Sequence, residues 1–182
     1  MKKFFTICIG LILSMSLMTA CGGKDKDKGS AGKEQTVKDG GDLGGTAVNQ
    51  TKDAGKDFTV TVLSIVSVDK GKHFKPQAGN KFVFVKVAVK NNSDEEKNVS
   101  SVVNFNHFVD GKQGELDVDA GSALLEYEAD TLNGEVPAGE TFVGYYFFEA
   151  PVNSKSLELT FKPGLMPRGD MISFTMDIPK TR

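Results

Sequence analysis

One stretch decides the fold class, and it reads Asn80-Lys81-Phe82-Val83-Phe84-Val85-Lys86-Val87-Ala88-Val89-Lys90. Side chains of a β-strand point alternately to its two faces. The valines at 83, 85, 87 and 89 therefore share one face, and the other face carries Phe82, Phe84 and Ala88 beside Lys86 and Lys90. A strand with apolar residues on both faces belongs to a sheet that is covered on both sides. The stretch predicts a strand inside a β-sandwich whose outer face is partly covered.

The same alternation recurs along the chain between turn signals. We expect strands at residues 58–68, 80–90, 99–109, 141–150, 156–162 and 171–178. Residues 112–135 are less regular, and they fit either short edge strands at 115–118 and 124–127 or one helical turn. Asp110-Gly111 is typical of a hairpin, and Pro137-Ala138-Gly139 is typical of a type I turn. Short strands separated by turns predict an all-β sandwich or barrel over residues 57–182.

The N-terminus has the three parts of a secretory signal. Lys2 and Lys3 precede an apolar run over residues 4–17, and Leu17-Met18-Thr19-Ala20-Cys21 resembles the lipobox of bacterial lipoproteins. We expect a signal peptide at residues 1–20, a lipidated Cys21, and a domain tied by lipid to the extracytoplasmic face of the cell membrane. The alternative is an ordinary signal peptide with a chance cysteine. A transmembrane anchor is disfavoured because a spanning helix needs about 20 apolar residues.

Residues 21–56 are expected to form a disordered linker. They include the alternating run Lys24-Asp25-Lys26-Asp27-Lys28, many glycines and few large apolar residues, a composition that cannot offset the entropy of the chain. Removal of residues 1–20 would also remove Cys8, so the mature chain would keep Cys21 as its one cysteine and form no internal disulfide. The domain would then be stabilised by its core.

Charge argues against a nucleic-acid partner. The full chain has 22 Lys and Arg against 24 Asp and Glu, and loss of Lys2 and Lys3 leaves 20 against 24, a formal charge of −4. Proteins that bind nucleic acid carry a basic patch or stripe, which this balance does not indicate.

Two segments point to a family. One is residues 79–92, which contain the strand quoted above and end in Asn91-Asn92. The other reads Leu132-Asn133-Gly134-Glu135-Val136-Pro137-Ala138-Gly139-Glu140-Thr141-Phe142-Val143-Gly144-Tyr145. Both resemble a bacterial lipoprotein family with a telokin-like, immunoglobulin-like domain of unknown function that follows a lipobox and a low-complexity stem.

The resemblance covers roughly residues 57–180 of this chain. It implies an immunoglobulin-like antiparallel β-sandwich of about seven strands, and it implies no activity. The chain lacks the Cys…Trp…Cys pattern of true immunoglobulin domains, so the likeness concerns architecture. Fold alone does not establish function.

Catalytic signals are sparse. His73 and His107 lie in different segments, and no Gly-x-Ser-x-Gly nucleophile elbow is present. Two separate imidazoles do not provide a metal-type spacing. We therefore expect no enzyme, no cofactor and no metal centre.

Three other patterns have alternative interpretations. The acidic residues between 115 and 135 form either a solvated edge or a surface for calcium or a basic partner: Glu115, Asp117, Asp119, Glu126, Glu128, Asp130 and Glu135. Calcium prefers oxygen ligands, but the EF-hand spacing is absent. The aromatic run at 145–148 is either core or an exposed patch, and core is favoured. Arg168-Gly169-Asp170 matches an adhesion tripeptide, but a simple turn is favoured.

Taken together, these patterns predict a non-enzymatic, membrane-anchored module that binds an envelope or extracellular protein. The alternative is a module that senses or captures a small ligand or a cation such as calcium near the acidic segment 115–135.

Overall fold

The computed structural model describes residues 41–164 and 170–182. Its elements in chain order are β1 (Thr46–Ala54), β2 (Phe58–Val68), β3 (Asn80–Asn91), β4 (Lys97–Ser100), β5 (Phe105–Val109), β6 (Lys112–Gln113), α1 (Val118–Glu126), β7 (Asn133–Val136), β8 (Thr141–Pro151), β9 (Ser156–Phe161) and β10 (Ile172–Asp177). The predicted signal peptide, Cys21, residues 21–40 of the predicted linker, and Arg168 with Gly169 lie outside the described residues.

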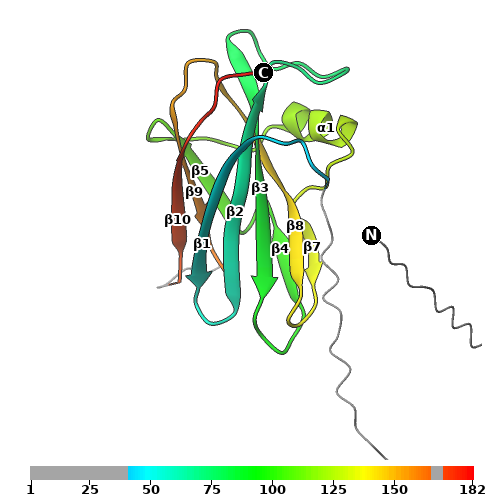
Figure 1. The fold of residues 1–182 in the computed structure, drawn as a ribbon, viewed down its shortest axis with the longest axis vertical. Coiled ribbons are helices and arrows are strands. Elements are labelled where there is room, and N and C mark those ends of the chain that lie inside the picture. Colours follow the sequence, from blue (N-terminus) through cyan, green and yellow to red (C-terminus); the bar gives the residue numbers. More distant parts are fainter. Residues whose placement is uncertain (1–40, 165–169) are drawn as a thin grey trace, which may run out of the picture. The chain divides into compact units, whose positions relative to one another are not determined.

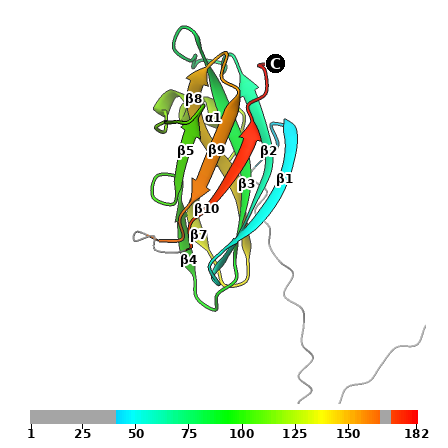
Figure 2. The same ribbon diagram turned by 90° about the vertical axis from the view of Figure 1, so that its left-hand side faces the viewer.

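The strands form two facing antiparallel sheets. One has the order β1-β2-β3-β8 and the other the order β10-β9-β5-β6, and a two-stranded sheet β4-β7 lies beside them. Figure 1 looks onto the first sheet, and Figure 2 shows the two layers from the side. The predicted antiparallel β-sandwich is confirmed, with ten strands in the described residues where about seven were expected.

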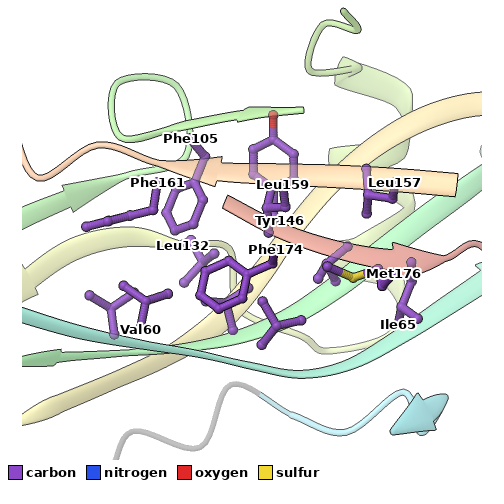
Figure 3. Packing of buried hydrophobic residues seen from close by; sticks show 14 of the residues in the cluster. Val60, Ile65, Phe105, Leu132, Tyr146, Leu157, Leu159, Phe161, Phe174 and Met176 are labelled. Atoms are coloured by element: carbon purple, nitrogen blue, oxygen red, sulfur yellow. The ribbon is translucent and has the colours of Figure 1, made fainter. Parts of the chain in front are cut away.

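The main core lies between the two sheets. Val60 and Val85 of the first sheet face Leu159, Phe161 and Phe174 of the second, and all five side chains are buried. Figure 3 shows how several of these aromatic and aliphatic side chains from different strands interdigitate. The valine face of residues 80–90 is thus the core face, as the alternation predicted.

The opposite face of the first sheet is also covered. Phe82 and Phe84 pack in a second cluster with Ala120 and Leu124 of α1. The expectation that both faces of this strand are covered is therefore confirmed, but the cover is a helix. Neither the edge strands expected at 115–118 and 124–127 nor a single helical turn is found there.

Local sequence explains why α1 forms. Asp117 is its N-cap, and its carboxylate accepts a hydrogen bond from the backbone N–H of Ala120 at 2.7 Å. Asp119 adds negative charge to the first turn, where the helix dipole favours it. The buried side of the helix is made of small residues and Leu124, so the helix can lie close to the sheet.

The folded region begins earlier than residue 57. Strand β1 pairs with β2 from Thr46↔Ile65 to Ala54↔Phe58, so residues 46–54 do not belong to a linker. Most of β1 is exposed and polar, which is why its pattern resembled a linker. Its side chains also reach the other sheet: Gln50 Nε2 donates to the carbonyl of Thr175 at 3.0 Å, and Lys52 Nζ donates to the carbonyl of Ser173.

The single strand expected at residues 99–109 is divided into β4 and β5, which lie in different sheets. Asn104 causes the break, because its backbone N–H donates to the carbonyl of Ser100 at 2.8 Å and its Oδ1 accepts from the N–H of Ser100. This local ring of hydrogen bonds lets the chain leave β4 and start β5.

A search of the described residues for a helix long and apolar enough to cross a membrane finds none.

Candidate functional site

The buried side chain of Asn91 joins two loops at one end of the sandwich. Its Nδ2 donates to the carbonyl of Glu95 at 2.7 Å and to the carbonyl of Val136 at 2.9 Å, and its Oδ1 accepts from the backbone N–H of Ser93 at 3.0 Å. The carbonyl of Asn91 also accepts from the N–H of Gly139 at 3.0 Å. One residue at the end of β3 therefore orders both the 92–96 loop and the 137–140 turn.

The two segments joined in this way border a groove of about 660 Å³. Buried Val136 and Phe142 line its base. The remaining lining residues come from the 92–96 loop, β4, β7, the turn and the start of β8: Glu96, Asn98, Gly134, Glu135, Pro137, Glu140 and Thr141. Figure 1 shows β4 and β7 at the lower end of the domain, beside the start of β8. The volume lies within the range of about 300–1,000 Å³ that is common for ligand pockets.

The charge in this groove has one sign. Its lining contains Glu96, Glu135 and Glu140 and no Lys, Arg or His. The nearby Lys97 points its ammonium at Glu95, 3.3 Å away. Residues 113–154 of the chain contain no basic residue at all, so β7, the turn and β8 contribute none. On the neighbouring strand β3, Lys90 is the cross-strand partner of the groove residue Thr141, but it is not among the lining residues.

Some other carboxylates in the described part of the chain have structural partners. Hydrogen bonds from the backbone N–H groups of Ser156 and Lys155 hold the pKa of Asp110 below its ordinary value. Glu149 accepts from the N–H of Gln77 at 2.6 Å and from Asn80 Nδ2 at 2.9 Å. These carboxylates stabilise turns and strand ends.

By contrast, none of the groove carboxylates has a hydrogen bond or ion pair with any residue in the ranges 41–164 and 170–182. Glu96 and Glu135 are exposed and Glu140 is half-buried, so no group in the described ranges competes for their carboxylates. Three unpartnered carboxylates around a partly apolar groove can receive a cationic group from another molecule.

The acidic residues predicted as a ligand or partner surface are dispersed. Asp117 caps α1, and Glu126 binds the 70–74 loop through the backbone N–H groups of Lys72 and His73 and through His73 Nδ1 at 2.7 Å. Of the other five, Glu135 lines the groove, and the remaining four are exposed: Glu115, Asp119, Glu128 and Asp130. In the described ranges no group of three or more His, Cys, Asp or Glu side chains is arranged to hold a metal ion.

The two histidines have separate structural partners. His107 is buried, stacks on Phe148 with ring centroids 4.1 Å apart, and places Nδ1 2.9 Å from the hydroxyl of Tyr146. Burial lowers the pKa of His107 to about 4, so the ring is neutral at ordinary pH. His73 is exposed and contacts Glu126. The structure does not bring these histidines together.

The aromatic run is core, as favoured from the sequence. Tyr145, Tyr146 and Phe148 are fully buried, and Phe147 is partly buried against the cluster under α1. Of the adhesion tripeptide the structure describes Asp170 alone, which is exposed.

Sequence reasoning missed the groove itself. It identified the Pro137-Ala138-Gly139 turn and the strand end at Asn91-Asn92, but it ended the acidic segment at Glu135 and did not connect it with Glu96 or Glu140. The absence of basic residues over 113–154 was the available signal. The loop that contains Glu96 and the turn that contains Glu140 are held together by hydrogen bonds to Asn91. A sequence pattern does not show such long-range hydrogen bonds.

A search of curated proteins finds no match. Among solved structures, a candidate lipoprotein, ycdA, from Bacillus subtilis subsp. subtilis str. 168 has a TM-score of 0.57 and 19% identity, over 71% of this chain and 39% of that one. This chain therefore corresponds to well under half of the ycdA structure.

Two further structures match over nearly their whole length. A conserved hypothetical protein from Bacillus anthracis has a TM-score of 0.52 and 21% identity, covering 74% of this chain and 95% of that one. The yjhA protein from Bacillus subtilis has a TM-score of 0.53 and 15% identity, covering 74% and 99%. At these identities the likeness concerns the fold.

The match to a family model is broader evidence, because it covers most of the chain and includes both segments that carried the resemblance. It extends from the first residue of β1 to the residue before β10. Residues 46–171 match the domain of unknown function DUF4352, and the chain belongs to this family.

Proposed function

We propose that this protein is a lipid-anchored, extracytoplasmic binding module that holds a cationic partner in the acidic groove at the β4–β7 end of its sandwich. The observation that carries the proposal is the set of three unpartnered carboxylates, Glu96, Glu135 and Glu140, around a groove with an apolar base. Carboxylates that have no role within the domain are expected to act on something outside it.

The anchoring part of the proposal rests on Leu17-Met18-Thr19-Ala20-Cys21. The fold shared with ycdA, which is described as a candidate lipoprotein, is consistent with the same attachment. If the Gly-rich residues 22–40 form the coil that their composition predicts, their root-mean-square reach is roughly 25 Å. A domain on such a stem could turn its groove toward partners in the envelope or outside the cell.

Binding is favoured over catalysis because the groove presents acceptors and no nucleophile paired with a base. Catalytic sites need a nucleophile and a base within hydrogen-bond reach of each other. The acidic lining of the groove suits the recognition of a positively charged partner, because complementary charges on two molecules increase the rate and specificity of their association.

Anchoring is tested by fractionating cells that express the chain with Cys21→Ser. The wild-type protein is expected in the membrane fraction and the variant outside it. Cys8→Ser is the matched control, because it changes a cysteine that the mature chain would lose, and it should leave the distribution unchanged. Full membrane retention of Cys21→Ser would refute the lipid anchor.

Groove binding is tested by crosslinking intact cells and recovering the anchored protein. The wild-type chain is expected to retain a partner that the double variant Glu135→Gln/Glu140→Gln loses. A double variant with the same charge change elsewhere, Glu115→Gln/Asp119→Gln, should retain it. Equal recovery by all three proteins would mean that the groove is not the binding site.

A further inference from the structure

The edge of β8 beside the groove identifies the class of partner, and this inference rests on the function proposed above. We propose that the groove binds an extended peptide segment with lysine or arginine side chains, which pairs with the edge of β8 at Thr141 and Val143 and places its cations against Glu135, Glu140 and Glu96.

The first step is that alternate residues of β8 point their backbone N–H and C=O groups away from β3. The N–H of Tyr145 donates to the carbonyl of Asp130 at 2.8 Å, and its carbonyl accepts from the N–H of Leu132 at 3.2 Å. Both partners lie on the side away from β3. In an antiparallel pair the residues alternate in the direction of their hydrogen bonds, so Val143 and Thr141 also point their N–H and C=O groups away from β3.

The second step is that the backbone of this part of the edge is not paired within residues 41–164 and 170–182, although Val143 itself is buried. Segment 130–132 occupies the edge at Tyr145 through the parallel bridge Thr131↔Tyr145, and then the chain turns into β7, which pairs with β4 and not with β8. No hydrogen-bond partner is found for the outward groups of Thr141 and Val143 in the described residues. An unpaired strand edge is a template for another extended chain.

The third step is that the open edge borders the groove. Thr141 and Phe142 line it on the β8 side, and Gly134 and Glu135 line it on the β7 side. A peptide that pairs with β8 here would occupy the groove, as in β-strand addition, where main-chain hydrogen bonds supply affinity and side-chain contacts supply specificity. The chain's own residues 130–132 already pair with this edge of β8, at Tyr145, two residues beyond Val143.

Charge selects the side chains of the peptide. Glu135 projects from β7, Glu140 from the turn and Glu96 from the neighbouring loop, and no basic lining residue competes for them. A lysine or arginine on such a peptide would meet a carboxylate, whereas an acidic peptide would be repelled. A second copy of this chain is disfavoured for the same reason, because its corresponding surface is acidic.

The test uses the mature chain with Cys21→Ser, so that the protein stays out of the membrane, and four acetylated, amidated hexapeptide probes. They are alternating lysine and valine, alternating glutamate and valine, the lysine peptide N-methylated at its valines, and a lysine peptide with proline at those positions. The methylated and proline peptides keep the charge and lose backbone donors, so they separate strand pairing from simple charge attraction.

Binding is measured by titration calorimetry, and the site is mapped by amide chemical-shift changes. The lysine peptide is expected to bind, with shift changes at residues 134–136 and 140–143, and its affinity should fall on adding salt. Glu135→Gln/Glu140→Gln should weaken it at least tenfold, and the methylated and proline peptides should bind at least tenfold more weakly. Glu115→Gln/Asp119→Gln should leave the affinity unchanged.

Several results would overturn the inference: no binding at millimolar peptide, equal binding of the methylated peptide, shift changes away from the groove, or displacement of the peptide by millimolar calcium. If the peptides fail while partner recovery from cells still depends on Glu135 and Glu140, the strand-addition inference is wrong and the proposed function stands. If recovery from cells does not depend on the groove, the proposed function fails as well.

Discussion

The side-chain Nδ2 of Asn91 donates a hydrogen bond to the backbone carbonyl of Val136, 2.9 Å away and 45 residues further along the chain. This contact joins the end of a central strand to β7, and a second one from the same nitrogen reaches Glu95 at 2.7 Å. Because Asn91 is fully buried, water cannot replace it as a donor. The shape of the acidic groove depends on this one amide.

Replacing Asn91 by alanine should therefore destabilise the domain by about 3 kcal/mol, because buried carbonyl groups lose their donor and gain no water. The free energy of unfolding is measured by urea denaturation. Asn92→Ala is the matched control: the Asn92 side chain makes an exposed hydrogen bond to Thr59 Oγ1, and its loss should cost no more than about 0.5 kcal/mol. Equal urea midpoints for the two variants would contradict the role given to Asn91.

Gly144→Ala should destabilise the domain by about 2 kcal/mol through overpacking. Segment 130–132 crosses the edge of β8 at this residue, and a Cβ on Gly144 would lie 2.9 Å from the carbonyl oxygen of Thr131 and 3.2 Å from the nitrogen of Leu132. The melting temperature measures the effect. Gly164→Ala is the control, since a Cβ there meets no atom within 4 Å, and an equal fall in both variants would show that close approach is not the cause.

Stability should decrease as pH falls from about 6.5 toward 4 because of His107. Burial lowers its pKa to about 4 in the folded state, whereas the unfolded chain takes up the proton near pH 6.5. Between these values the unfolded state binds more protons, so stability rises with pH through the window and is flat above it. The loss from this group amounts to about 3 kcal/mol at pH 4.

The measurement is urea denaturation at a series of pH values for the wild type and His107→Gln, which keeps a polar group near the hydroxyl of Tyr146. The variant should lose most of the change between pH 6.5 and 4 that the wild type shows. Parallel pH profiles for the two proteins would mean that His107 is not the titrating group.

Glu126→Ala should loosen the 70–74 loop without unfolding the sandwich. The carboxylate accepts from the backbone N–H groups of Lys72 at 2.5 Å and His73 at 2.9 Å, and it contacts the His73 ring. Amide hydrogen exchange should speed up at residues 72 and 73 and remain slow in β3. Glu128→Ala removes an exposed carboxylate nearby and should leave both exchange rates as they are; unchanged exchange in Glu126→Ala would refute the contact's role.

Much of the sandwich could be predicted because its strands satisfy a simple local rule. Residues 80–90 alternate with period two, and the structure places their valines in the core between the sheets, as the pattern indicated. The last strand also alternates, with Phe174 and Met176 buried and Thr175 and Asp177 exposed. A residue that points inward in one strand is buried whatever its partner, so alternation predicts burial without knowledge of the pairing.

The predictions of the linker boundary and of residues 112–135 were wrong because the same local sequence pattern can arise from more than one physical cause. Glycines at 41, 44 and 45 were interpreted as linker, but a Cβ on Gly45 would lie 2.6 Å from the carbonyl oxygen of Ile65, so this glycine permits close approach to β2. Residues 118–126 form a helix because a sheet face is available for Leu124 to cover.

The amino-acid sequence by itself determined the all-β class and the central strand, since each depends on neighbouring residues in the chain, and its lipobox-like residues 17–21 support a lipid anchor that stays a prediction. Tertiary structure alone decided the acidic groove and the open edge of β8. Glu96, Glu135 and Glu140 line one groove, which Asn91 borders through its hydrogen bonds to Glu95 and Val136. The edge of β8 at Thr141 and Val143 is unpaired in the described residues because β7 pairs with β4 instead of β8. Local periodicity shows which face of a strand is buried, but it does not show which other strand it pairs with.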